Sequence, residues 1–298
     1  MPPIALPNCL SNFLVTPEKI RMKLCCSLMV RVTVLASGSK GNSTIVASSS
    51  TRILVDAGLS CRETVKRLRA SGEDAAALSA ILITHEHVDH IAGLRVLAEK
   101  FKIPVYMTGP THRAWFQMMR HEAKASERQL KDLARLEFFE AGRKFHIGDV
   151  AITPFTIPHD AADPVGFTFQ VEGVKLGFAT DLGYMPASVR QHLRGCDGLI
   201  IESNHDLEML RTGPYPWSVK QRVMSRVGHL SNEALAEFLT SDYDGGAAFM
   251  VLAHLSEQNN NPEIARVAAE RALGERPSLF QQELRLASQS QPLAAITL

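Results

Sequence analysis

The sequence predicts an α/β (α+β) fold built as a four-layer αββα sandwich, in which two sheets face each other and helices cover both outer faces. Two observations support this prediction. Short apolar, β-branched runs separated by Gly, Asn and Ser turns fill residues 31–58 and again residues 150–180. Each of these β-rich blocks is followed by segments in which helical patterning alternates with short apolar strands. No repeat or linker interrupts the chain, so residues 29–298 are expected to form a single domain.

The first half of the predicted fold starts with strands and continues with helices. The expected strands are RVTVLASGS (31–39), STIVAS (43–48), RILVDAG (52–58), AILIT (80–84) and KIPVYMT (102–108). Helices are expected near 61–71, over 90–101 and over 110–134. Both charge signs are frequent from 113 to 144, which indicates a solvated helical cover.

The second half repeats this organisation. The expected strands are VAITPFTIP (150–158), VGFTFQV (165–171), VKLGFAT (174–180), GLIIES (198–203) and AAFMVLAHL (247–255), with a tight turn at EGVK (172–175). Helices are expected near 216–226, 231–240 and 262–273.

Composition sets bounds on the class of protein. A 298-residue chain with 45% hydrophobic and 21% charged residues is long and apolar enough for one large globular domain. Its net charge of +1 neither requires nor excludes a nucleic-acid partner. Five cysteines without CxxC spacing suggest a reducing, cytoplasmic location, and no apolar run approaches the length of a membrane span. Residues 1–28 lack periodicity and are expected to be a disordered extension or to lie upstream of a true start at Met29.

The motif HEHVDH carries the strongest chemical signal. It follows the apolar strand ILIT and contains His85, His87, Asp89 and His90. Residues i and i+2 of an extended segment point the same way, so His85 and His87 can hold one metal ion. Where the chain turns into a helix, Asp89 and His90 can face a second ion. A polar strand-to-helix turn would not need four potential metal ligands at this spacing.

Two metal ions need further ligands, and three apolar strands end in suitable residues. His159, Asp181 and His254 each stand where a predicted buried strand runs into a loop. Each would be weak evidence alone, but together with the motif they complete a two-metal set. We assign the first ion to His85, His87 and His159, the second to Asp89, His90 and His254, and the bridging position to Asp181.

This pattern resembles the metallo-β-lactamase fold superfamily from about residue 31 to 260. The resemblance implies the αββα metallo-β-lactamase sandwich, two divalent metal ions and a metal-bridging hydroxide as nucleophile. No cysteine stands at a ligand position, unlike in zinc β-lactamases that have a Cys ligand. Imidazole and carboxylate ligands accept Zn²⁺ and Mn²⁺ alike, so the ligand set does not choose between them.

Two later segments, IIESNHD (200–206) and GHLSNEALAEFL (228–239), indicate the branch of the superfamily. Glu202 and His229 match a Glu–His pair of RNase Z-like phosphodiesterases that is thought to protonate the leaving oxygen. Chemically, an alkoxide leaving group needs a general acid, and histidine suits that role. Ser231 or Asn232 is expected to cap the helix that follows His229.

A finer resemblance connects the chain to the WalJ/YycJ-like family of metallo-β-lactamase fold hydrolases. The segments that carry it are VLASGSKGNSTIV (34–46), ILVDAG (53–58), THEHVDHIAGL (84–94), ATDLG (179–183), ESNHD (202–206), GHLSN (228–232) and HLSEQNN (254–260). The resemblance implies a cytoplasmic metal-dependent phosphodiesterase with 5′-to-3′ exonuclease action on double-stranded DNA.

Candidate substrate contacts lie in three segments. Residues 211–232 combine basic and aromatic side chains without an acidic residue, and could hold phosphates and stack a terminal base, or could form an ordinary amphipathic helix. The basic residues there are Arg211, Lys220, Arg222 and Arg226. The hairpin SGSKGNS (37–43) is expected to place its tip near the metal ions. The candidate substrate-binding residues are Ser39, Asn42, Asn204, Tyr215, Trp217 and Arg222, and the candidate catalytic residues are His229, Glu202, Asp89 and His205.

The sequence therefore predicts a dinuclear-metal phosphodiesterase, with the ends of duplex DNA as the expected partner. Two alternatives stay open: a hydrolase of a small, for example cyclic, phosphodiester, and a metal-binding regulatory protein without turnover. A lactamase or thioesterase is disfavoured by the Glu202–His229 pair. The oligomeric state is left open.

Overall fold

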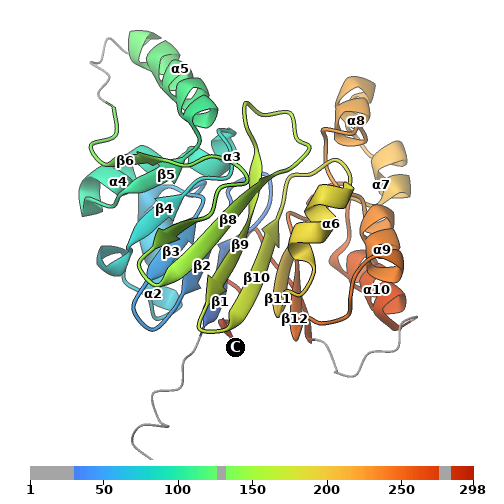
Figure 1. Ribbon diagram of the computed structural model, residues 1–298. Helices are drawn as coiled ribbons and strands as arrows, with labels where there is room; N and C mark the ends of the chain where they lie inside the picture. Colours follow the sequence, from blue (N-terminus) through green and yellow to red (C-terminus); the bar gives the residue numbers. More distant parts are fainter. Residues whose placement is uncertain (1–29, 126–131, 275–282) are drawn as a thin grey trace, which may run out of the picture.

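The computed structural model describes residues 30–125, 132–274 and 283–298. The extension expected over residues 1–28 lies outside these described residues. Within them, two seven-stranded sheets stand face to face with helices on both outer sides, as Figure 1 shows. The predicted four-layer sandwich is therefore confirmed.

The first sheet has the order β14-β1-β2-β3-β4-β5-β6, and the second has the order β13-β12-β11-β10-β9-β8-β7. The strands of the first sheet are β1 (Arg31–Ala36), β2 (Ser43–Ala47), β3 (Arg52–Val55), β4 (Ala80–Leu82), β5 (Val105–Met107), β6 (Leu136–Phe138) and β14 (Ile296–Thr297). Those of the second are β7 (Phe145–Ile147), β8 (Val150–Thr156), β9 (Val165–Val171), β10 (Val174–Ala179), β11 (Gly198–Glu202), β12 (Phe249–Ala253) and β13 (Glu283–Leu286).

The helices of the described residues divide between the two outer faces. Around the first sheet lie α2 (Cys61–Ala70), the 3₁₀ turn η1 (Ala75–Ala77), α3 (Val88–Ile91), α4 (Leu94–Phe101) and α5 (Gly109–Ala125). Around the second lie α6 (Ala187–Leu193), α7 (Leu207–Thr212), α8 (Trp217–Val223), α9 (Asn232–Ser241) and α10 (Pro262–Gly274). No helix of the described residues is long and apolar enough to cross a membrane.

Three apolar clusters hold the layers together. Between the sheets, β-branched residues of the first sheet such as Val55 meet aromatic residues of the second such as Phe167. On one outer face, Ile81 packs in a cluster with Trp115 of α5, and on the other, Leu252 packs in a cluster with Phe238 of α9. Burying these side chains on both faces of each sheet is the main stabilising contribution of the sandwich.

The direction of the strands determines where the site lies. Strands β3 to β6 are parallel in one sheet, and β10 to β13 are parallel in the other. Parallel strands bring their carboxyl ends to one edge of a sheet, where loops converge and ligands bind in open α/β sheets. The residues that follow β3, β4, β10 and β12 therefore meet at a common edge.

Part of the predicted helical cover is wrong. Of the helix expected over 110–134, α5 is described as far as Ala125, and residues 132–135 are not helical. Strand β6 pairs with β5 within the stretch expected to be helical over 113–144. Residues 126–131 lie outside the described part of the chain. A three-residue edge strand has too few positions for a periodic signal. It also depends on pairing with a strand that is distant in sequence, which no local pattern shows.

Other departures involve short elements. The helix expected over 90–101 is divided into α3 and α4, and Gly93 stands at the break. A Cβ on Gly93 would lie 1.9 Å from the Leu59 carbonyl oxygen, and one on Gly58 would lie 1.6 Å from that of Asp89. These two glycines thus allow the loop after β3 to press against α3. The edge strands β13 and β14 were also not predicted.

Candidate metal centre

The seven predicted metal ligands gather at the common edge of the two sheets. His85 and His87 follow β4, and Asp89 and His90 lie in the short helix α3. The remaining three come from the second sheet, at the ends of β8, β10 and β12. Ligand atoms of His85, His87 and His159 lie within 4.8 Å of one another, and so do those of Asp89, His90 and His254. These are the two sets proposed from the sequence.

Asp181 lies between the two sets. One carboxylate oxygen, Oδ2, is 3.4 Å from His90 Nε2, and the other, Oδ1, is 4.0 Å from His159 Nε2. Oδ1 is also 3.5 Å from His254 Nδ1. This position agrees with the bridging role that we assign to Asp181, since its two oxygens face imidazoles of different sets.

Backbone strain marks this edge. Asp56, Asp181 and His254 have positive φ angles of 61°, 62° and 56°. Non-glycine residues rarely adopt this left-handed conformation, and it persists only where the surrounding structure imposes it. Each of the three stands just past the end of a parallel strand.

Asp56 is a residue of this centre that the sequence reasoning did not assign to the site. It is fully enclosed, and its Oδ2 lies 2.8 Å from His90 Nδ1. Both oxygens also accept hydrogen bonds from the Thr84 hydroxyl, which in turn lies 3.0 Å from His85 Nδ1. With Nδ1 facing a carboxylate, His90 directs Nε2 toward the cluster, an arrangement that typically orients metal-bound histidines. The segment ILVDAG contained this signal, because a lone Asp ends an apolar strand there.

The other imidazoles are held in similar ways. His159 Nδ1 donates to the Gly228 carbonyl at 3.0 Å. The amide of Asn204 donates to the His254 carbonyl at 2.7 Å and lies 3.2 Å from its Nδ1. The Asn42 amide lies 3.2 Å from Asp89 Oδ2 and 3.0 Å from His90 Nε2. Asn42 and Asn204, predicted as substrate contacts, are buried and contact ligand side chains.

Burial and neighbouring charges shift the pKa values of the ligand side chains in different directions. Burial, with neighbouring imidazoles, holds the pKa of His85 well below its ordinary value, so this ring keeps a free lone pair. Burial alone would lower the pKa of His90, but the carboxylates of Asp181 and Asp56 outweigh it and raise that pKa to about 9. Burial would raise the pKa of Asp181, and the surrounding imidazoles outweigh that effect and lower it.

Unsatisfied atoms in the cluster test whether these residues fit a metal. Among the described residues, His85 Nε2, His254 Nε2 and Asp181 Oδ2 are buried without a hydrogen-bond partner. Such groups cost about 1–3 kcal/mol each unless something satisfies them. All three belong to the predicted ligand set, and imidazole and carboxylate are ordinary ligands of divalent metal ions. The residues therefore fit divalent metal ions.

Glu202 and His229 form a close pair beside this cluster. Glu202 Oε1 lies 2.8 Å from His229 Nδ1 and 3.0 Å from His254 Nδ1, while Oε2 accepts from the amides of Leu182 and Leu230. Both oxygens are thus engaged, so Glu202 is better suited to orienting imidazoles than to binding an ion, although its position would permit either. His229 is partly open, with 18% of its side chain exposed. Ser231 caps α9, as predicted.

His205 contrasts with His229. It is 1% exposed, and its Nδ1 has no hydrogen-bond partner among the described residues. Burial lowers the pKa of His205 to about 4, so the ring is neutral in the folded protein at neutral pH. Its carbonyl oxygen accepts from the Asn232 amide at 2.9 Å. The structure thus places this predicted catalytic residue within the protein interior.

In the predicted substrate segment around α7 and α8, three of the four basic side chains already have partners within the protein. Lys220 is buried and donates to the Arg211 carbonyl at 2.7 Å, and the Arg226 guanidinium lies 4.1 Å from the centre of the Tyr184 ring. Arg222 pairs with Asp160, an acidic residue from another segment. Trp217 is 63% exposed and Tyr215 is half-buried, while Ser39 is exposed on the hairpin between β1 and β2.

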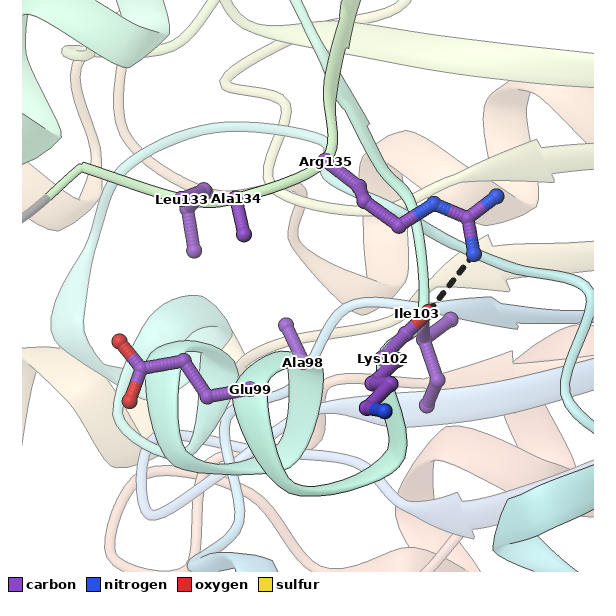
Figure 2. A pocket seen from close by; sticks show the side chains of 7 residues that line it. All are labelled: Ala98, Glu99, Lys102, Ile103, Leu133, Ala134 and Arg135. Carbon is purple, nitrogen blue, oxygen red and sulfur yellow. Dashed lines mark hydrogen bonds between the residues drawn. The ribbon is translucent and has the colours of Figure 1, made fainter.

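A separate cavity of about 350 Å³ lies away from this edge, between the end of α4 and residues 133–135. Figure 2 shows Ala98 of the helix facing Leu133 and Ala134, with the Glu99 side chain extending to one side, while Arg135 donates to the Lys102 carbonyl at 2.9 Å. None of the predicted site residues lines it.

Comparisons with known proteins agree with this geometry. A family model described as beta-lactamase superfamily domain matches residues 51–255. The chain is 39% identical over 247 residues to exodeoxyribonuclease YycJ of Bacillus anthracis, covering 82% of this chain and 89% of that protein. It is 37% identical over 237 residues to exodeoxyribonuclease WalJ of Streptococcus pneumoniae serotype 2, covering 80% and 86%.

Among solved structures, the metallo-beta-lactamase fold protein YhfI of Bacillus subtilis superposes with a TM-score of 0.64 at 18% identity, covering 89% of this chain and 99% of that one. At this identity the likeness shows the fold alone.

Proposed function

This chain belongs to the beta-lactamase superfamily domain family, and from that premise we propose that it is a dinuclear-metal exonuclease that degrades double-stranded DNA from 5′ ends. It is a metal-dependent hydrolase of the nuclease and phosphodiesterase class, as predicted from the sequence. The finer statements, which are two metal ions, duplex DNA, the 5′-to-3′ direction and a cytoplasmic location, are our proposal.

The pairing of Glu202 with His229 is the observation that carries this proposal. Because His229 Nδ1 faces the Glu202 carboxylate at 2.8 Å, Nε2 is the ring nitrogen left to exchange a proton with a substrate. The same carboxylate oxygen is 3.0 Å from His254, which ties the pair directly to the ligand cluster. A protonated His229 at this place can donate to the oxygen that leaves phosphorus. Hydrolysis of a thioester has less need of such an acid, because a thiolate leaves without protonation.

Two divalent ions held by the two ligand sets and Asp181 would lower the pKa of a bound water and neutralise charge on the phosphate oxygens. The chain's own residues supply the rest. Asp56, Asn42 and Asn204 fix the orientation of the ligand side chains, and His229 provides the proton at its Nε2. Fixing these groups before the substrate arrives is what makes such sites efficient.

The support for DNA comes from the relatives rather than from charge. The two relatives compared above are exodeoxyribonucleases. In this chain, however, the Asp160 carboxylate offsets the charge of Arg222, and Lys220 is buried against the Arg211 carbonyl, so the segment offers less exposed positive charge than its sequence suggests. That observation favours a second candidate, a hydrolase of a small phosphodiester, which would use the same centre without a long electrostatic track.

Digestion of end-labelled DNA distinguishes the candidates. Protein loaded with Zn²⁺ or Mn²⁺ is incubated with duplex and single-stranded DNA labelled at the 5′ or 3′ end, beside a cyclic nucleotide. Release of mononucleotides from the 5′ end of the duplex, lost with a chelator, supports the proposal. Turnover of the cyclic nucleotide alone would favour the second candidate, and turnover of none of these would contradict both.

A further inference from the structure

Asp160 forms an ion pair with Arg222 at the edge of the metal centre. Arg222 Nε lies 2.5 Å from Oδ2 of Asp160, and Nη2 lies 3.1 Å from Oδ1, so the guanidinium grips both oxygens. The Asp160 amide also donates to the Val227 carbonyl at 3.1 Å. Main chain and side chain together attach the loop after β8 to the segment around α8.

This ion pair directly adjoins the first ligand set. Oδ1 of Asp160 is 3.5 Å from His159 Nε2 and 4.0 Å from His87 Nε2. Oδ1 of Asp160 thus accepts a hydrogen bond from Arg222 and also faces two predicted ligands. The Asp160 carboxylate therefore lies between the Arg222 guanidinium and the first ligand set. Lys220 and Arg226, from the same basic segment, are directed instead to the Arg211 carbonyl and the Tyr184 ring.

The chemistry of the pair suits exchange with a phosphate. A guanidinium that binds a carboxylate through two N–H groups binds two phosphate oxygens in the same way. The Arg222 side chain is 56% exposed and that of Asp160 is 28% exposed, and ion pairs in contact with water are weakly stabilising.

We propose that Asp160 is a specificity-determining positioning residue, which holds the Arg222 guanidinium at the centre until a phosphate oxygen of the substrate takes its place. The inference rests on the proposed phosphodiesterase function and names how that site selects its substrate. An anionic phosphodiester can replace the carboxylate on Arg222, whereas a neutral ester or amide cannot.

A double-mutant cycle tests the inference. Asp160→Asn, Arg222→Gln and the combined variant are compared with the unaltered protein on 5′-labelled duplex DNA. Asp160→Asn should lower KM several-fold with kcat unchanged, because the phosphate no longer displaces a charged competitor. Arg222→Gln should raise KM by roughly 10-fold, as expected for the loss of a charge-assisted hydrogen bond. Added to Arg222→Gln, Asp160→Asn should have no further effect on KM, since the two residues act together.

Two results would overturn the inference. An equal drop in KM from Asp160→Asn with or without Arg222 would mean that Asp160 only repels the substrate at a distance. A change in metal affinity on Asp160→Asn, measured by competition with a chelator, would mean that Asp160 binds an ion itself. The matched control is the Arg190–Asp242 pair, which has an N–O distance of 2.5 Å and lies between α6 and α9. Arg190→Gln and Asp242→Asn should leave KM unchanged.

The same cycle can be run on the affinity of the metal-loaded protein for inorganic phosphate, by calorimetry. Asp160→Asn should tighten phosphate binding only when Arg222 is present. If this holds while no phosphodiester is hydrolysed, the proposed function fails and the role of Asp160 stands. If hydrolysis occurs but the coupling is absent, the role of Asp160 fails and the function stands.

Discussion

The metal centre and the basic segment, residues 211–232, differ in where their side chains find partners. In the centre, ligands predicted from strand ends meet one another and are held by buried polar residues such as Asp56. In the basic segment, Arg222 and Lys220 find partners that no local pattern shows, an acid from the loop after β8 and a carbonyl of α7. The centre is thus an ordered arrangement of ligands, whereas the basic segment has much of its charge already engaged.

This difference suggests how the work of the protein is divided. Chemistry depends on the centre, where a small displacement of a ligand should be costly. On the proposed function, substrate binding would involve the exposed side chains of the basic segment, such as Arg222, and each single contact would contribute little. Variants of the centre should therefore change rate and metal content, and variants of the segment should change affinity and its dependence on salt.

The largest effect is expected for Asp181→Asn. Asparagine keeps the shape and tolerates the left-handed backbone at this position, but it removes the charge between the two ligand sets. We expect metal content to fall and activity to drop on the order of 1,000-fold, because metal ions supply several kcal/mol of transition-state stabilisation. Metal analysis and steady-state kinetics check this. Full activity with full metal content would show that Asp181 does not bridge.

A pH-dependent effect on stability is expected from His205. Its pKa of about 4 in the folded state lies below the ordinary 6.5, so the unfolded chain binds more protons between these values. Stability should therefore be fully present above pH 6.5 and fall as the pH drops toward 4, by roughly 3 kcal/mol from this group. Urea unfolding of metal-loaded protein at several pH values should show a flatter dependence for His205→Gln. An unchanged dependence would mean that His205 is not buried in its neutral form.

Asp56→Asn should have a smaller effect than the loss of a ligand. Its carboxylate orients His90 without lying among the ligands, and residues in such positions typically contribute 10- to 100-fold to metal affinity or activity. Asparagine again suits the positive φ angle of 61°. Chelator competition should show weaker metal binding in a protein that is still folded. Unaltered metal affinity would mean that Asp56 contributes to the folded structure but does not support metal binding.

The smallest effect is expected in the basic segment. Arg211→Gln should reduce the slope of log Kd for DNA against log salt by about one, if Arg211 contacts a phosphate. Lys220→Gln should leave that slope unchanged, because the Lys220 ammonium is buried against the Arg211 carbonyl. DNA-binding titrations at several salt concentrations compare the two. Equal slopes for all three proteins would remove Arg211 from the substrate contacts.

The sequence predicted the sandwich because the signals that define its elements are local. Short apolar runs such as ILIT indicate strands, and turn residues such as those of EGVK indicate where strands are connected. His159, Asp181 and His254 could be grouped because each follows a predicted buried strand. In the structure, Asp181 and His254 follow parallel strands, and β8, which runs in the same direction as β10, brings His159 to the same edge. The strand β6 could not be predicted in the same way, since its three residues become a strand only by pairing with Val105–Met107.

Contacts between side chains that are distant in sequence could not be predicted either. Residues 211–232 contain no acid, so their basic residues seemed available, yet Asp160 lies beside Arg222 once the loop after β8 is folded. Asn42 and Asn204 were recognised as belonging to the site, but their contacts with ligand side chains depend on the approach of distant loops. Such contacts are decided by tertiary packing, which composition and periodicity do not encode.

The most direct test of the account compares leaving groups. If His229 protonates the leaving oxygen, His229→Ala should slow release of nucleotides from DNA by 10²- to 10⁴-fold, the usual contribution of a general acid. The same variant should lose far less activity on bis(p-nitrophenyl) phosphate, whose leaving group needs little protonation, and should keep its metal ions. Equal losses on both substrates with metal retained would contradict the central claim that His229, oriented by Glu202, is the acid.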